Sequence, residues 1–249
     1  MATVTTPRTE PGRMSFLEHL GELRVRLFRA LLSIGLFFGV GWYYSRQIFN
    51  FLLEPIRPYL KGSKPVFLDI TEPFFLFMKV AFLAGLFAAS PFVLYQLWAF
   101  ISPGLYPQER RYAAPFVIFS SLFFLAGGAF GYYIAFPYAA RFLLKVAEGF
   151  EPALTMHGLF QFESRLILGM GLVFELPVLI LLLAKLGIVT PQFLARNLKY
   201  AVLVSFIVAA VITPTPDVVT QCVFAIPMIA LYVVGLGASL LVRGRRGDG

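Results

Sequence analysis

Residues 95–111 read YQLWAFISPGLYPQERR and separate two long apolar runs that carry no charge. Aromatic residues come first, two prolines and a glycine follow, and the cluster Glu109, Arg110 and Arg111 ends the stretch. Interfacial aromatics, helix breakers and a water-facing charged tip are typical of a loop between two transmembrane helices. The stretch therefore predicts a membrane hairpin.

The composition of the whole chain also indicates a membrane protein. Of its 249 residues, 59% are hydrophobic and 14% are charged, and the mean hydropathy is +0.79. Soluble domains are about 45–50% apolar and about 25% charged. The balance excludes an ordinary soluble domain, and the single cysteine forms no disulfide framework.

Charged residues divide the chain into six apolar blocks, one of which carries Glu175 as its only charge. About 20 residues cross a bilayer, so the blocks predict six transmembrane helices. An even number puts both termini on one side, and most of the 21 Lys and Arg residues then fall on that side, which predicts cytoplasmic termini. The blocks are residues 30–45, 80–108, 112–140, 166–184, 200–216 and 218–242.

The predicted fold is an all-α integral membrane protein with six helices in one concave bundle. Three prolines inside the second, fourth and sixth helices, Pro91, Pro177 and Pro227, are expected to bend them. The fifth and sixth helices are predicted to be short. For the fifth, residues 200–213 span about 21 Å at 1.5 Å per residue, against a hydrocarbon core of about 30 Å.

The domain prediction has three parts. Residues 1–13 are polar and predict a disordered tail, residues 14–242 form a single six-helix membrane domain, and residues 243–249 form a basic cytoplasmic tail. Within the membrane domain, residues 46–72 and 141–163 are predicted as outer loops. The first of these loops contains an amphipathic segment that is expected to lie along the outer interface.

Glycine pairs spaced four apart predict close helix contacts. They are Gly35 with Gly39 in the first helix and Gly127 with Gly131 in the third.

No nucleotide-binding, hydrolase or metalloprotease motif occurs, and the two histidines are far apart. The sequence therefore predicts that the protein is not an enzyme. It also predicts no metal site, no cofactor and no nucleic-acid partner. What remains is a set of charges at the inner surface, together with Glu175 within an apolar block. The inner-surface set is Glu22, Arg24, Glu109 and Arg111.

Four segments carry a resemblance to a known family. The pattern LYQxWxFxxPGLYxxER lies within the hairpin, and HLGELRVRL, FELP and PDVVTQ occupy residues 19–27, 174–177 and 216–221. Together they resemble TatC, the polytopic subunit of the twin-arginine protein translocase. The match spans nearly the whole chain.

The resemblance implies a receptor and assembly core that binds twin-arginine signal peptides for export of folded proteins driven by the proton-motive force. It also implies TatA-like and TatB-like single-span partners, an oligomeric working complex, and a place in a bacterial or archaeal cytoplasmic (inner) membrane. Two other classes stay open. One is a proton-coupled solute transporter that uses the intramembrane carboxylate, and the other is a scaffold that binds partner helices but ignores signal peptides.

The family's acidic positions for signal binding match Glu22 and Glu109. A guanidinium presents a planar fork of donors suited to carboxylate, so adjacent arginines require two carboxylates, and lysine is a poor substitute. Arg24 and Arg111 match family positions as well and are expected to orient the glutamates or to bind phosphates. Phe100 matches the family's loop phenylalanine, where it either packs against the peptide or anchors the interface.

Each of these assignments has a structural alternative. Glu22 forms an i,i+4 pair with Arg26, which alone accounts for a glutamate at that position. Glu175 matches the family's intramembrane glutamate, which is expected to take part in docking a partner helix or the signal; the alternative is a protonated residue satisfied by a neighbouring helix. Thr213 and Gln221 match positions that help seat single-span partners, and helix packing alone also explains them.

Overall fold

The computed structural model describes residues 16–60, 65–101, 113–149, 154–213 and 217–243. These residues are almost entirely helical, and their one extended pairing is a bridge between Val66 and Thr155. The all-α class predicted from the sequence is confirmed. The elements are α1 (Phe16–Tyr43), α2 (Ser45–Leu52), the 3-10 turn η1 (Arg57–Tyr59), α3 (Glu72–Ile101), α4 (Ala113–Phe130), the π-helical η4 (Gly131–Ala135), α5 (Phe136–Val146), α6 (Met156–Phe174), α7 (Leu176–Lys185), α8 (Pro191–Arg196), α9 (Leu198–Ile212) and α10 (Val218–Arg243).

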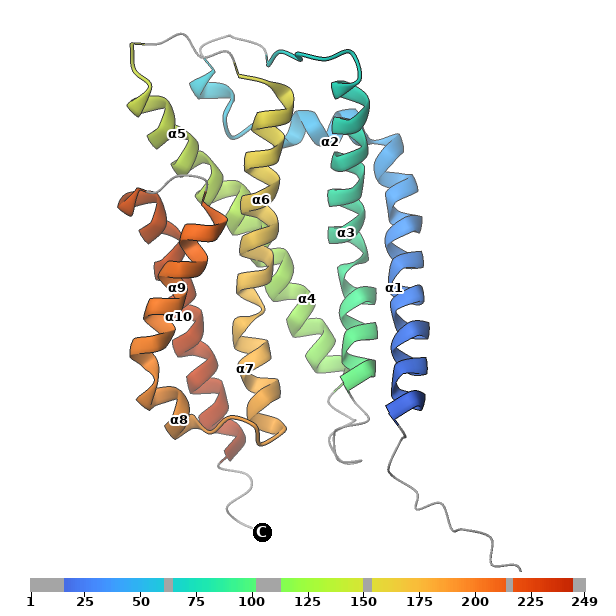
Figure 1. Ribbon diagram of the computed structural model, residues 1–249, viewed down its shortest axis with the longest axis vertical. Coiled ribbons are helices and arrows are strands. Elements are labelled where there is room, and N and C mark those ends of the chain that lie inside the picture. Colours follow the sequence, from blue (N-terminus) through green and yellow to red (C-terminus); the bar gives the residue numbers. More distant parts are fainter. Residues whose placement is uncertain (1–15, 61–64, 102–112, 150–153, 214–216, 244–249) are drawn as a thin grey trace, which may run out of the picture.

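The long helices stand side by side in one bundle (Figure 1). α1 packs along α3, α4 crosses α6, and α10 packs against both α7 and α9. The first turn of α1 and the last turn of α10 lie at the same end of the bundle, which we call the termini face (Figure 1). We call the opposite end the cap face, because α2 and η1 lie across it beside the first turns of α3 and α6.

Four helical stretches are long and apolar enough to cross a membrane, judged by length and composition among the described residues. α1, with 28 residues, runs alongside α3 in the same bundle. The number of spans predicted from the sequence stays a prediction, as does the side on which the termini lie. The four stretches are Glu72–Ile101, Ala114–Val146, Met156–Lys185 and Val218–Leu240.

The fifth predicted span is short in the structure, whereas the sixth is not. α9 has 15 residues, which is about 22 Å at 1.5 Å per residue. α10 has 26 residues and continues through Pro227, so the predicted short sixth helix is wrong. The reason lies in the sequence: after Val218 no charged residue occurs before Arg243, and one missing amide hydrogen at a proline does not end a helix packed on two neighbours.

Small residues let α4 and η4 pack closely against α6. A Cβ atom built on Gly127 would lie 2.4 Å from the backbone oxygen of Met170, and one on Gly131 would lie 2.8 Å from Cα of Ile167. The predicted close contact of the third span is confirmed, and its partner is α6.

The predicted contact of Gly35 and Gly39 is wrong, because no atom of another described helix lies within 4 Å of a Cβ built on either residue. α1 instead approaches α3 at Gly41, where a Cβ would lie 2.8 Å from the backbone oxygen of Ala81. A four-residue spacing shows which face two glycines share, but not whether another helix covers that face.

The second predicted outer loop, residues 141–163, is mostly helical. α5 continues to Val146, and α6 begins at Met156 after an N-cap formed by Thr155, whose side chain accepts a hydrogen bond from Gly158 N at 3.0 Å. Glu163 consequently lies inside the bundle, with only 1% of its surface exposed. The prediction placed Glu163 at the end of an outer loop, because the fourth apolar block was taken to begin after Arg165.

Candidate functional site

Glu22 lies at the termini face where α1 packs on α3. Arg26, one turn further along α1, donates to Glu22 Oε1 from Nε at 3.0 Å and from a terminal nitrogen at 2.8 Å. The other terminal nitrogen of Arg26 lies 3.5 Å from the side-chain oxygen of Gln96 on α3. The i,i+4 pair expected from the sequence is therefore present, and its arginine reaches across to the second helix.

This ion pair occupies only one oxygen of the Glu22 carboxylate. The Glu22 side chain is 19% exposed. Its Oε2 is buried and accepts no hydrogen bond from any described residue. A sheltered carboxylate oxygen without a donor is costly, whereas a charged donor brought to it forms a strong, charge-assisted bond. The arrangement leaves one anionic acceptor available beside a fixed guanidinium.

Phe100 belongs to the same junction. Its ring stacks on His19, with ring centroids 4.4 Å apart and planes 17° apart. His19 precedes Glu22 by one helical turn. The last turn of α3 thus places the Phe100 ring against α1 one helical turn from Glu22.

Arg24 is exposed, and the donors to the Glu22 carboxylate come from Arg26 instead. Positions two apart on a helix point about 200° apart, so Arg24 is poorly placed to orient Glu22. Glu109 and Arg111 lie outside the described residues. α3 ends at Ile101 and α4 begins at Ala113, and both of these helix ends are at the termini face (Figure 1).

Glu175 occupies the break between α6 and α7. Pro177 follows it and has no amide hydrogen, so the helix does not continue undisturbed through this point. The carboxylate is directed to α4, where Ser120 Oγ donates to Oε2 at 2.5 Å. Oε1 is buried and has no hydrogen-bond partner in the part of the chain that the structure describes. No pattern in the sequence points to Ser120, because a serine in an apolar run is commonly bonded to its own helix.

Thr213 and Gln221 lie at the cap-side ends of α9 and α10. The Gln221 amide Nε2 donates to the backbone oxygen of Phe206 at 2.9 Å, which ties α10 to α9. The Thr213 hydroxyl donates to the oxygen of Ala209 in its own helix at 2.9 Å. These bonds match the helix-packing explanation, and contact with a partner helix stays a prediction.

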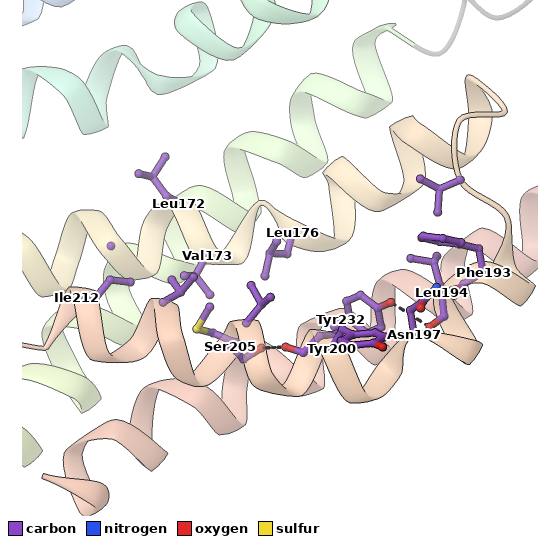
Figure 2. A pocket seen from close by; sticks show the side chains of 16 residues that line it. Leu172, Val173, Leu176, Phe193, Leu194, Asn197, Tyr200, Ser205, Ile212 and Tyr232 are labelled. Atoms are coloured by element: carbon purple, nitrogen blue, oxygen red, sulfur yellow. Dashed lines mark hydrogen bonds between the residues drawn. The ribbon is translucent and has the colours of Figure 1, made fainter. Parts of the chain in front are cut away.

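A groove of about 780 Å³ lies between the α6–α7 pair and α9. Figure 2 shows that mostly apolar side chains from the helices on both sides line the groove. Two of the three hydroxyl groups in its lining are already bonded to backbone oxygens: Ser205 donates to Ala201 at 2.8 Å and Tyr232 donates to Leu194 at 3.0 Å. The groove suits an apolar chain or helix and offers little to a hydrophilic solute. The lining labelled in Figure 2 is Leu172, Val173, Leu176, Phe193, Leu194, Asn197, Tyr200, Ser205, Ile212 and Tyr232.

These observations define a class first: an all-α, multi-span membrane protein with a carboxylate at the α1–α3 junction and another in the break between α6 and α7. No group of His, Cys, Asp or Glu that could hold a metal ion occurs among the described residues. The family model described as "Sec-independent protein translocase protein (TatC)" matches residues 18–227. The chain belongs to this TatC family.

Individual relatives agree with the family model. The TatC protein of Koribacter versatilis is 48% identical over 92% of this chain and 86% of its own length. That of Escherichia coli K12 is 36% identical over 92% of this chain and 89% of its own. A solved structure titled as the twin-arginine translocase receptor TatC superposes with a TM-score of 0.77 at 35% identity, over 90% of this chain and 98% of that one.

The family fixes the general role of the chain. It is a component of the Sec-independent protein translocase and a multi-pass protein of the inner membrane, and it is not an enzyme. The resemblance identified from the four sequence segments is confirmed.

Proposed function

We propose that this chain is the receptor and assembly core of its translocase, and that it binds the paired arginines of twin-arginine signal peptides at the termini face. The observation that carries the proposal is the buried Glu22 Oε2, which lacks a donor among the described residues. A guanidinium that enters this junction completes the coordination of the carboxylate and lies close to the Phe100 ring, which is stacked on His19 one turn away.

The second arginine requires a second carboxylate, and Glu109 is the one we assign to it. The two helix ends that flank the segment containing Glu109 lie at the same face as Glu22 (Figure 1). Arg111 and Arg24 carry the same charge as the ligand, so their proposed role is to attract phosphates of the membrane surface. In this proposal the termini face is cytoplasmic, because signal peptides reach the membrane from the cytoplasm.

Single-span TatA-like and TatB-like subunits are the proposed occupants of the apolar groove. An apolar helix can bury its side chains against these mostly apolar walls, because the polar groups of Asn197, Ser205 and Tyr232 are bonded internally. Thr213 at the end of α9 and Gln221 in the first turn of α10 mark the proposed contact. The proton-motive force drives the proposed export step.

The test compares two peptides that differ only in the arginine pair. A fluorescent twin-arginine signal peptide and its twin-lysine counterpart are titrated against the protein in lipid nanodiscs. The proposal predicts that the lysine peptide binds at least roughly tenfold more weakly, since an ammonium cannot form the two parallel bonds of a guanidinium. Equal affinity for the two peptides would reject the proposed recognition.

A further inference from the structure

The cap face contains a second pocket that the proposed function does not use. Its volume is about 810 Å³, and its walls come from α2, η1, the start of α3 and the segment after Pro65. Buried Phe49, Leu53 and Leu60 contribute the apolar floor, whereas the polar groups of the lining are two arginines and an asparagine.

The polar side chains of this pocket, Arg46, Asn50 and Arg57, lie on one face of a helical segment. Arg46, Asn50, Leu53 and Arg57 follow one another at spacings of four, three and four residues, which is one face of a helix. The helical hydrogen bonding extends past the end of α2, because Leu53 N donates to Phe49 O at 3.1 Å and Arg57 N donates to Leu53 O at 3.1 Å. Both guanidinium groups and the amide therefore line the same cavity.

The positive charges of this pocket are not compensated within the described chain. Arg46 lies over the ring of Phe77, 5.7 Å from its centroid, which positions the guanidinium and leaves the donors at its edge available. Neither Arg46 nor Arg57 forms an ion pair with a described carboxylate, and Glu54 on the same segment does not line the pocket. A complementary ligand is anionic at one end and apolar at the other.

The position of the pocket relative to the bilayer narrows the ligand further. α2 lies across the end of the bundle rather than along it (Figure 1). Exposed Trp42, Tyr43 and Tyr44 directly precede it. Such aromatic belts mark the depth of the lipid head groups.

We propose that this pocket binds an anionic phospholipid from the leaflet at the cap face. The phosphate is held by Arg46 and Arg57, and the upper part of an acyl chain covers the apolar floor. The inference does not depend on signal-peptide binding, because it concerns the opposite face of the molecule.

The experiment measures lipid retained by the purified full chain in native mass spectrometry, after equilibration with equal amounts of phosphatidylglycerol and phosphatidylethanolamine. Wild type is expected to retain phosphatidylglycerol preferentially. The double variant Arg46→Gln/Arg57→Gln is expected to retain at least about tenfold less phosphatidylglycerol than wild type. The matched control Arg141→Gln/Lys145→Gln removes two exposed basic residues of α5, outside the pocket, and is expected to behave like wild type.

Three outcomes would overturn the inference. They are equal retention of the two lipids by wild type, unchanged retention in the arginine variant, and displacement of the lipid by inorganic phosphate or an acidic peptide, which would identify a different ligand. If the double variant does not fold, Met156→Trp gives an independent reading, because it fills the pocket and leaves both arginines in place. Its expected result is the same loss of phosphatidylglycerol, and full retention counts against the site.

Discussion

Replacing Glu22 by glutamine removes the negative charge at the α1–α3 junction and changes the shape of the side chain little. In the structure Arg26 holds Oε1, and Oε2 is left for the ligand. A glutamine satisfies Arg26 with its one amide oxygen and then presents an NH₂ group to the incoming guanidinium. Two donors facing each other form no bond, so we expect binding of a twin-arginine peptide to weaken.

The size of the effect follows from burial. A hydrogen bond to a charged group in a sheltered site contributes about 1.5–3 kcal/mol, whereas an exposed ion pair contributes about 0–1 kcal/mol. The Glu22 side chain is 19% exposed, which puts it in the lower half of the sheltered range. We therefore expect a loss of about 1.5–2 kcal/mol, or roughly a 10- to 30-fold increase in Kd.

The assay is fluorescence anisotropy of a labelled signal peptide with the protein in nanodiscs, and thermal unfolding of each variant serves as the folding check. Glu18→Gln is the matched control, because it makes the same change on the same helix one turn earlier, at an exposed position. The reasoning is refuted if Glu22→Gln binds within twofold of wild type, or if Glu18→Gln weakens binding equally.

Three further predictions concern the rest of the bundle. Ser120→Ala leaves the carboxylate in the α6–α7 break without its described donor, so we expect unfolding to become easier by about 1–3 kcal/mol; a midpoint equal to wild type in thermal scans contradicts this. Gly127→Ala drives a Cβ into the backbone of α6 and is expected to destabilise by about 1–3 kcal/mol, whereas Gly35→Ala, with open space around it, should be neutral or stabilising by up to about 1 kcal/mol; the same thermal scans rank the two. Ala201→Trp fills the groove between the α6–α7 pair and α9 and is expected to abolish co-purification of single-span partners, while Leu203→Trp, on an exposed surface outside the groove lining, is expected to retain them; equal loss in both variants argues against the groove as the partner site.

Much of the fold could be predicted from where charges interrupt apolar runs, because charge is excluded from a helix that faces lipid. The same rule explains the error at Glu163, which is buried within α6. A helix that packs on protein can hold a carboxylate, and a single sequence does not show which neighbour covers it. The prediction of which glycines in α1 contact another helix was wrong for the same reason, since Gly41 and not Gly35 meets α3.

The candidate site was likewise predictable from the sequence only in part. Glu22 and its pairing with Arg26 follow from spacing along one helix, and the structure contains that pair. The partners on other helices lie far away in the sequence. Gln96 is 70 positions from Arg26, and Ser120 is 55 positions from Glu175. A local sequence pattern does not show which distant residues come into contact. The partners on other helices could therefore be identified only in the folded structure.

The most direct test is to find where the arginines of a bound signal peptide lie. A photo-crosslinking residue placed next to the arginine pair, followed by mass-spectrometric mapping, reports the contact site in the intact membrane. We predict crosslinks to the α1–α3 junction around Glu22 and Phe100 and to the segment containing Glu109, with little product from a twin-lysine peptide. Crosslinks at the cap face, or equal yields from the two peptides, would contradict the account.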